Sequence, residues 1–460
     1  MTERPPRGPL TARQLACEVL IAWTGPHDFP TRDLERRLPE LASPAERRLA
    51  TELVHGVVRR AATLTALLKP HLQRDWEGLE PELRRLLQLG VYQLVFLSGI
   101  PVHAAVNETT ELARWLHKPR WLGFLNGLLR SVSRSTTDRD SDQPASLAVP
   151  LQAGRYRILE RAAIPDPRVD FPGYFAAAFS FPPWLAERWS QRFDRETLLR
   201  MGFWFNTPPR LYLRANTLRS SREQLLEALA AQGIAAEAGT AGNSILVDGQ
   251  CRVRDLPGYE TGWFAVQDDS SQQAAELLAP QPGERVLDLC AAPGGKTAHM
   301  AALMNNQGTI LACDVEVHRL DRVVENCTRL GVDIVRPCLV TRDGAGLPNG
   351  PFDRILLDAP CSNTGVLARR PEARWRLEPA ELTELAELQT RLLHSAIARL
   401  ALGGTLVYST CSIEPDENQE VIEAVLRESP ALRQDAAQSH VPGAPADGGY
   451  QVRLRNVMTA

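Results

Sequence analysis

The sequence predicts a multidomain protein with an all-α N-terminal domain, a small α+β module and a C-terminal α/β domain of the Rossmann-like type. Three observations support this fold class. At 460 residues the chain is too long for one ordinary core. Its first part places apolar residues at helical spacing, and its last part alternates apolar strands with helices.

The N-terminal part, residues 11–130, is predicted to be helical throughout. Leu15, Val19 and Ala22 form one apolar stripe, and Pro81 is a suitable first residue of a helix. A second stripe comprises Leu49, Leu53, Val57, Leu64 and Leu68. No stretch here alternates with period two, so we assign residues 1–134 to a helical domain. We expect its paired arginines either to lie on solvated faces or to contact RNA. They are Arg47, Arg48, Arg59, Arg60, Arg84 and Arg85.

The middle of the chain changes composition twice. Residues 135–170 begin with many Ser, Thr, Asp and Pro residues, which is typical of a linker. Residues 171–270 then mix helices and short strands, which predicts a small α+β module. The expected helices are 185–201 and 220–232, and the expected strands are 209–214, 244–247 and 263–266.

The C-terminal part, residues 271–460, alternates near-continuous apolar runs with helical segments. Such runs are typical of strands that are buried on both faces of a parallel sheet. The five expected strands are 285–289, 309–313, 334–338, 352–357 and 405–409, and helices are expected to begin near Gln272, Lys296, His318 and Glu381. A doubly wound sheet would place its site at the carboxyl ends of these strands.

Composition excludes several classes of protein. With 44% hydrophobic and 23% charged residues, the chain has the composition of a soluble globular protein, and no apolar run approaches a membrane span. The Pro- and Arg-rich start lacks the apolar core of a signal peptide. Eight cysteines without paired CxxC motifs predict neither a disulfide scaffold nor a metal site, so we expect a cytoplasmic protein. The net charge of −3 argues neither for nor against nucleic acid.

The first expected strand of the sheet ends in a Gly-rich turn that leads into a helix. Its residues are Cys290, Ala291, Ala292, Pro293, Gly294, Gly295 and Lys296. Alone, this turn could hold NAD, phosphate or nothing, and it has neither the dinucleotide nor the P-loop spacing. Asp314 ends the second strand, where an acid can bind the ribose hydroxyls of an adenosine, and Asp343 follows the third, near an adenine. Together they favour an adenosyl ligand.

Two cysteines follow neighbouring strands at the same edge of the sheet. Cys361 lies in Asp-Ala-Pro-Cys-Ser after strand four, and Cys411 lies in Ser-Thr-Cys-Ser after strand five. Single cysteines such as Cys17, Cys313 and Cys327 are expected to be inert core residues. A thiolate beside an adenosyl ligand suits methylation of cytosine carbon 5, because its addition to carbon 6 makes carbon 5 nucleophilic. A carboxyl group on the N3 side would stabilise the charge that develops there.

The segments CAAPGGKT, DAPCS with NTGVLARRPE, and STCS resemble motifs of the RNA 5-methylcytosine methyltransferases. The helical domain is similar to the antitermination factor NusB, and the combination resembles the bacterial small-subunit rRNA cytosine methyltransferases of the Sun/Fmu type. The resemblance covers nearly the whole chain. It implies a class I methyltransferase domain and an RRM-like module, with S-adenosylmethionine as cofactor and 16S ribosomal RNA as partner.

The same resemblance implies roles for individual residues. Cys411 would be the nucleophile and Cys361 would act in product release. Residues 290–296, Asp314, Asp343 and Asp358 would surround the cofactor, and Asp358 and Lys296 would also reach the target base. Lys296 is one of only three lysines in an arginine-rich chain, which favours a need for a compact ammonium group.

Two alternatives for the function remain, along with two departures from the family pattern. The same chemistry on tRNA or large-subunit rRNA is one alternative, and a non-catalytic RNA-binding assembly factor is the other. The chain ends at Ala460, where such proteins usually add an aromatic-rich closing strand, so a truncated or atypical C-terminus is expected. Asp343 lies in Thr-Arg-Asp-Gly, where a Gly-Asp pair is commoner. We expect a monomer that does not contact a membrane.

Overall fold

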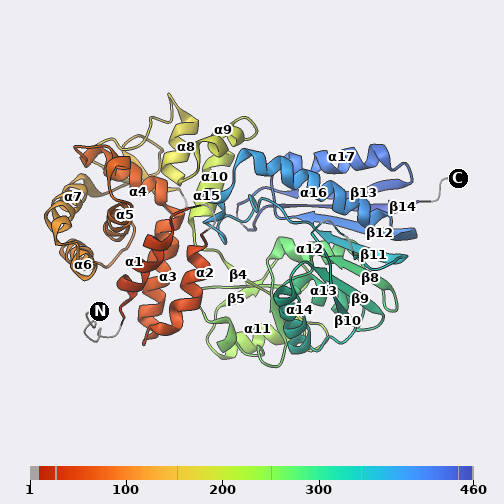
Figure 1. Ribbon diagram of the computed structural model, residues 1–460. Coiled ribbons are helices and arrows are strands. Elements are labelled where there is room, and N and C mark those ends of the chain that lie inside the picture. Colours follow the sequence, from red (N-terminus) through yellow and green to blue (C-terminus); the bar gives the residue numbers. More distant parts are fainter. Residues whose placement is uncertain are drawn as a thin grey trace, which may run out of the picture. The chain divides into compact units, whose positions relative to one another are not determined.

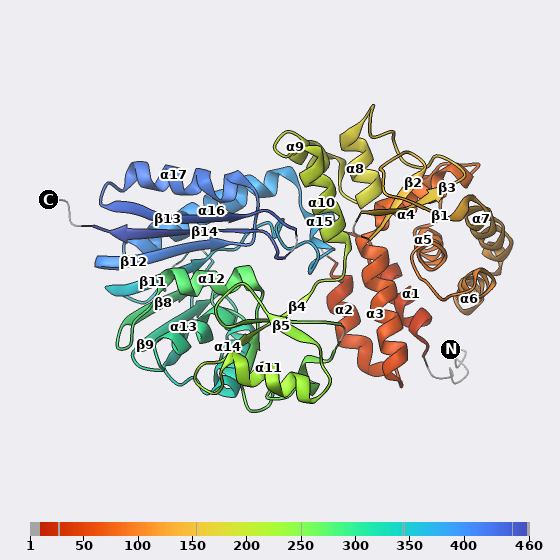
Figure 2. The same ribbon diagram turned by 180° about the vertical axis from the view of Figure 1, so that it is seen from behind.

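The computed structural model describes residues 10–25, 28–152, 154–249, 251–342, 344, 346–443 and 445–457. Its contacts divide the chain into two compact units (Figures 1 and 2). The first unit ends at Pro208 and also contains the segment Leu367–Leu377. The second unit comprises Pro209–Val366 and the chain from Glu378 onward.

The first unit begins with the expected helices. In the described residues they are α1 (Ala12–Ala22), α2 (Pro30–Arg37), α3 (Pro44–Arg59), α4 (Ala61–Leu68), α5 (Pro81–Val95), α6 (Val102–Trp115) and α7 (Leu122–Ser135). Thr11 and Gln14 form a capping box at the start of α1, and Pro81 opens α5 as expected. The second apolar stripe divides between α3 and α4 at Arg60, which has non-helical dihedrals.

The rest of the first unit differs from the expected linker. Residues 135–170 contain a three-stranded antiparallel sheet of order β1-β3-β2, which the polar composition concealed. Its strands are β1 (Thr136–Ser141), β2 (Ala148–Gln152) and β3 (Arg155–Leu159). Three helices follow: α8 (Phe171–Phe179), α9 (Pro183–Ser190) and α10 (Arg195–Asn206). The single helix expected over 185–201 is therefore two, because Asp194 caps α10 by accepting from the Thr197 backbone N–H at 2.8 Å.

Two of the arginines expected on solvated faces are buried instead. Arg59 and Arg60 are each 5% exposed. Arg60 donates to the carbonyls of Pro150 and Leu151 at 2.8 Å, and its guanidinium lies 4.2 Å from the ring centroid of Phe96. These side chains are therefore engaged within the unit.

The second unit begins with a four-stranded antiparallel sheet of order β5-β6-β4-β7. Its elements are β4 (Leu211–Ala215), α11 (Arg222–Ala231), β5 (Ala236–Ala238), β6 (Ser244–Val247) and β7 (Phe264–Val266). Ser221 caps α11 together with Gln224. The module encloses a small core that includes Leu225, Ile245 and Phe264.

The remainder of the second unit is a seven-stranded sheet of order β10-β9-β8-β11-β12-β14-β13 in the described residues. Its strands are β8 (Arg285–Leu289), β9 (Thr309–Asp314), β10 (Val335–Leu339), β11 (Phe352–Asp358), β12 (Leu400–Thr410), β13 (Leu432–His440) and β14 (Gly449–Asn456). Its helices are α12 (Asp269–Leu278), α13 (Gly295–Leu303), α14 (Val317–Leu330), α16 (Pro379–Ile397) and α17 (Gln419–Glu428). The first five strands in this order are parallel, which confirms the Rossmann-like fold class.

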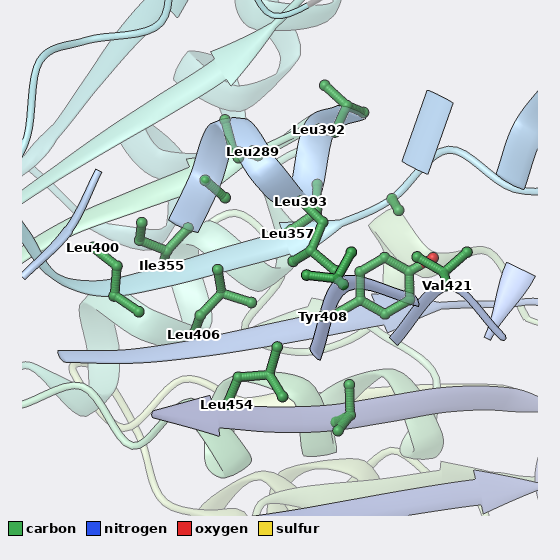
Figure 3. Close-up of a cluster of buried hydrophobic side chains, with 14 of the residues drawn as sticks. Leu289, Ile355, Leu357, Leu392, Leu393, Leu400, Leu406, Tyr408, Val421 and Leu454 are labelled. Carbon is green, nitrogen blue, oxygen red and sulfur yellow. The ribbon is translucent and has the colours of Figure 1, made fainter. Parts of the chain in front are cut away.

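Helices cover both faces of this sheet (Figure 1), and a hydrophobic core lies on each face. On one face, α12, α13 and α14 pack on Val286, Ile310 and Leu356. On the other, α16 and α17 pack on Ile355, Leu357 and Tyr408, as Figure 3 shows. Alternate residues of β11 therefore enter opposite cores, and this alternation fixes the register of the strand against its neighbours.

The expectation of a missing closing strand is wrong. β14 pairs antiparallel with both β12 and β13, and its Val452 and Leu454 are fully buried. The strand alternates apolar with polar residues and carries one aromatic residue, Tyr450, so an aromatic-rich pattern could not reveal it.

The segment Leu367–Leu377 contains a short helix, α15 (Ala373–Arg376), that is part of the first unit. Arg374 is fully buried there, and its guanidinium lies 4.3 Å from the ring centroid of Phe181. It donates to oxygen atoms of Leu367, Arg59, Phe179, Ser180, Phe205 and Asn206. Burial holds the pKa of Arg374 below its usual range.

We predict that Arg374→Met destabilises the protein by about 3 kcal/mol, because several buried carbonyls lose a charged donor. For a unit of this size the loss corresponds to a fall in Tm on the order of 10 °C. Thermal unfolding followed by circular dichroism measures it. Arg130→Met on the exposed face of α7 is the matched control. An unchanged Tm for the Arg374 variant would contradict this assignment.

Candidate active site

The site lies at the carboxyl ends of β8, β9, β11 and β12, where the strand order reverses between β8 and β11. After β8 the chain turns sharply through Cys290, which has a φ of +61°, and Gly294, which has a φ of +96°. A Cβ on Gly294 would lie 3.1 Å from the Val323 backbone, so a side chain would be strained there. The turn delivers the first amides of α13 to the strand ends, where they can bind a polar ligand.

The thiol of Cys290 lies in this turn but is a poor candidate for a nucleophile. Burial, with the nearby carboxylates of Asp358 and Asp314, raises the pKa of Cys290 to about 12. A thiol with such a pKa is protonated at neutral pH, and only the thiolate is strongly nucleophilic.

Asp288, within β8, is a fully buried carboxyl group beneath the turn. Its Oδ2 accepts from the Thr297 hydroxyl at 2.6 Å, whereas its Oδ1 has no hydrogen-bond partner among the described residues. Burial raises the pKa of Asp288 to about 7, and the Thr297 hydrogen bond opposes that rise. A buried acceptor without a donor is costly, and a ligand donor could satisfy it.

Asp314, at the end of β9, is where the sequence placed a ribose-binding acid. Its side chain is only 1% exposed, and it pairs with Arg319 at 3.2 Å. The backbone N–H groups of Ala292 and Val315 also donate to this carboxylate. A ligand hydroxyl would therefore have to share Asp314 with Arg319 or displace that arginine, which is 41% exposed and free to move outward.

Lys296 and Asp358 form an ion pair between the start of α13 and the end of β11. Burial lowers the pKa of Lys296, but the charges of Asp358 and Cys411 raise it by more than burial lowers it. The net pKa of Lys296 is therefore above its usual range. The ammonium group is therefore charged at neutral pH. Lys296 lies close enough to Cys411 for its positive charge to favour the thiolate form of that side chain.

The two predicted cysteines meet in the structure. Cys361 Sγ and Cys411 Sγ are 3.2 Å apart, and both are free thiols. A disulfide bond is about 2.05 Å long, so this is a contact between sulfur atoms and not a bond. The hydrogen bond to Cys411, with burial, raises the pKa of Cys361 well above its usual range. Cys361 is therefore protonated at neutral pH.

Several polar residues around the cysteines were not predicted from the sequence. Asn363 accepts from Cys411 Sγ at 3.4 Å, and it adopts a left-handed conformation with a φ of +62°. Gly365 approaches the neighbouring chain so closely that a Cβ would lie 2.8 Å from the Cys411 carbonyl oxygen. Ser362 and Ser412 share the buried carboxylate of Glu417. The repeated Cys-Ser pair was the one sequence signal for this network.

The structure thus brings Cys361, Cys411, Lys296 and Asp358 together at one edge of the sheet. The Cys290–Lys296 turn and Asp314 lie at the neighbouring strand ends. Asp343 lies outside the described residues. Their catalytic and cofactor-binding roles remain predictions at this point. None of the helices in the described part of the chain has the length and apolarity needed to span a membrane.

Family models match three parts of the chain. The model described as 16S rRNA methyltransferase RsmB/F matches residues 275–453. The NusB family model matches residues 10–134. A third, the ferredoxin-like domain of RsmF/B-like methyltransferases, matches residues 181–254.

Whole-chain relatives agree with these models. The chain is 36% identical to "Probable ribosomal RNA small subunit methyltransferase B" of Synechocystis sp., over 91% of this chain and 90% of that protein. It is 37% identical to ribosomal RNA small subunit methyltransferase B of Pseudomonas syringae pv. tomato, over 85% and 81%. A crystal structure of a methyltransferase homolog from Pyrococcus horikoshii aligns with a TM-score of 0.56 and 29% identity, over 61% of this chain and 97% of that one.

Proposed function

We propose that this chain, which belongs to the RsmB/F family of 16S rRNA methyltransferases, methylates carbon 5 of a cytosine in 16S rRNA with S-adenosylmethionine as methyl donor. Cys411 is the covalent nucleophile in this proposal. The observation that carries it is the 3.2 Å contact between Cys361 and Cys411 beside the Lys296–Asp358 pair. We infer a cytoplasmic location, since ribosomal RNA is the substrate.

The residues at the strand ends fit an adenosyl cofactor. Asp288 Oδ1 is a buried acceptor without a donor among the described residues, and the α13 amides follow the Cys290–Lys296 turn. Asp314 and Asp358 would complete the cofactor site. The proposal also assigns Asp343, which lies outside the described residues, to cofactor binding. When bound, S-adenosylmethionine supplies an electrophilic methyl group on its sulfonium sulfur.

Cys411 performs the first covalent step in this mechanism. Its thiolate forms a bond to carbon 6 of the cytosine, and the electrons of the carbon 5–carbon 6 double bond shift toward carbon 5 and N3. Asp358 and Lys296 hold the N3 side of the ring, where charge develops. Lys296 also keeps its positive charge near Cys411 and so favours the thiolate before the attack.

In the release step, the covalent bond between Cys411 and carbon 6 is broken after carbon 5 has been methylated. A base removes the proton from carbon 5, the double bond re-forms, and the Cys411 thiolate leaves carbon 6. We assign assistance in this step to Cys361, because its sulfur lies next to the leaving sulfur. In the resting thiol form, Cys411 Sγ donates to Asn363 Oδ1 at 3.4 Å, and this bond is absent once the sulfur is bonded to carbon 6.

We further propose that the helical N-terminal residues read the RNA. The match to the NusB family supports this role, and it favours ribosomal RNA over tRNA. The RNA-contacting residues must differ from Arg59 and Arg60, since both are buried.

The first prediction from this proposal is that the purified protein transfers labelled methyl groups from S-adenosylmethionine to 16S rRNA, because each part of the site has a role in that reaction. Filter binding measures incorporation, and bisulfite sequencing locates the 5-methylcytosine. Transcripts of 23S rRNA and tRNA are the comparison. Label in those RNAs instead would support the alternative substrates, and no label in any RNA would support a non-catalytic assembly factor.

The second prediction is that Asp314→Ala weakens S-adenosylmethionine binding by roughly tenfold to a hundredfold. Hydrogen bonds to charged groups contribute roughly 1.5–3 kcal/mol, and the ribose would lose such a bond. Isothermal titration calorimetry measures the Kd. Arg319→Ala is the matched control, because it frees Asp314 and should leave affinity equal or higher. Equal affinities for wild type and Asp314→Ala would remove Asp314 from the cofactor site.

The third prediction separates the two cysteines. Cys411→Ala should abolish both methylation and any covalent protein–RNA adduct, because attack precedes methyl transfer. Cys361→Ala should attack and methylate but release slowly, which leaves an adduct that survives denaturing electrophoresis. Cys251→Ala, at an exposed thiol, should behave as wild type. Accumulation of adduct in Cys411→Ala instead would reverse the roles, and two variants like wild type would exclude covalent catalysis.

A further inference from the structure

Glu417 is a buried carboxyl group that the proposed reaction does not use. It ends the short 3-10 helix Pro415–Glu417 after the Cys411 loop, and its side chain is fully covered. One oxygen accepts from the Ser362 backbone N–H at 2.8 Å and from Gln389 Nε2 at 2.9 Å. The other accepts from the hydroxyls of Ser362 and Ser412. Four donors therefore converge on one carboxyl group.

Three of those donors come from the two loops that carry the thiols, and the fourth, Gln389, comes from α16. Ser362 directly follows Cys361, and Ser412 directly follows Cys411. The two hydroxyls are also 3.1 Å from each other, and Thr364 Oγ1 lies 3.1 Å from Ser412 Oγ. Glu417 thus joins two segments that lie about 50 residues apart in the sequence, one residue away from each sulfur.

Glu417 is itself held in place by its backbone and by its neighbour. The Tyr408 hydroxyl donates to the Glu417 carbonyl oxygen at 2.6 Å. The Asn418 side chain donates to the Ser412 carbonyl at 3.0 Å and accepts from the Thr410 hydroxyl at 2.6 Å. The carboxyl group therefore has little freedom to follow the loops if they separate.

The charge at this position is consistent with the hydrogen bonds. Burial raises the pKa of Glu417 above its usual range, and the hydrogen bonds from Ser362 and Ser412 oppose part of that rise. A carboxylate accepts at both oxygens, which matches four donors, whereas an amide would offer one acceptor and one donor. The charge of Glu417 also contributes to the raised pKa of Cys361, so it helps to keep that thiol protonated.

We propose that Glu417 is a positioning residue that holds Cys361 and Cys411 at reacting distance by bonding the serine that follows each of them. It acts through the two loops and touches neither RNA nor cofactor. The proposal deepens the function proposed above and rests on it for the catalytic consequence. The positioning itself is a property of the free protein and can be tested without a substrate.

Glu417→Gln keeps the size of the side chain but turns one acceptor into a donor that faces donors. We expect kcat for methylation to fall by roughly tenfold to a hundredfold, since a small misplacement of reacting groups has effects of that size. The Kd for S-adenosylmethionine should stay within about twofold, because the change lies outside the cofactor site. Glu420→Gln, an exposed acid three residues further on, is the matched control.

Thiol proximity is measured by oxidising the protein with diamide, which accepts the two electrons and two protons that a Cys361–Cys411 disulfide releases. Peptide mapping by mass spectrometry quantifies the disulfide. Wild type and Glu420→Gln should form it readily, since the sulfur atoms are 3.2 Å apart. Glu417→Gln should form it several-fold more slowly, at a temperature well below its Tm.

Unchanged disulfide formation and unchanged kcat in Glu417→Gln would overturn the proposal. A lower Tm and weaker cofactor binding with normal disulfide formation would also overturn it, since that pattern indicates a general structural role. If Glu417→Gln does not fold, Ser362→Ala decides by the same criteria, because it removes one hydroxyl donor and keeps the backbone N–H. If disulfide formation responds as expected but wild type methylates no RNA, the positioning stands and the proposed function fails.

Discussion

The parallel pairing of β11 with β12 is the constraint on which the whole site depends. Asp358 pairs with Ser409, and the Ala359 backbone N–H continues the ladder to the Ser409 carbonyl at 2.8 Å. The two strands therefore leave the sheet at the same level, and the cysteines that follow within three residues meet at 3.2 Å. The same register places Leu357 and Tyr408 in one core, so a slip of one residue would turn the side chains of the shifted strand toward the opposite core and separate the thiols.

The polar groups at these strand ends are arranged so that each charge has a specific partner. Lys296 pairs with Asp358, while the Glu417 carboxyl group accepts hydrogen bonds from Ser362, Ser412 and Gln389. In the proposed mechanism the first pair faces the target base, and the second group bonds the serines that follow the two cysteines. A lysine suits the first position because its compact ammonium can pair with one carboxylate and still act at Cys411, whereas a planar guanidinium favours two-point binding.

The sequence predicted most of the parallel sheet, because strands buried on both faces are continuous apolar runs; β8 has the predicted bounds. It did not reveal β1 or β13, whose side chains are mostly solvent-exposed and polar, so no apolar pattern marks them. The residues of the site likewise fall into those that the sequence could predict and those that it could not. Cys361 and Cys411 could be predicted because each directly follows a recognisable strand. Glu417 and Arg374 could not, since their partners come from segments far away in the sequence and only the folded chain brings them together.

The contact between the sulfur atoms also determines when each thiol can act. The pKa of Cys361 is raised mainly by its hydrogen bond to Cys411, with burial second and the charge of Cys411 third. In the free enzyme Cys361 therefore stays protonated while Lys296 favours the thiolate of Cys411. Once Cys411 is bonded to carbon 6 in the proposed mechanism, its sulfur would be an uncharged thioether, which removes the influence of charge and leaves a weaker hydrogen-bond acceptor. In that mechanism Cys361 would lose its proton more readily than before the attack, so the adduct would prepare the neighbouring thiol for the step that ends it.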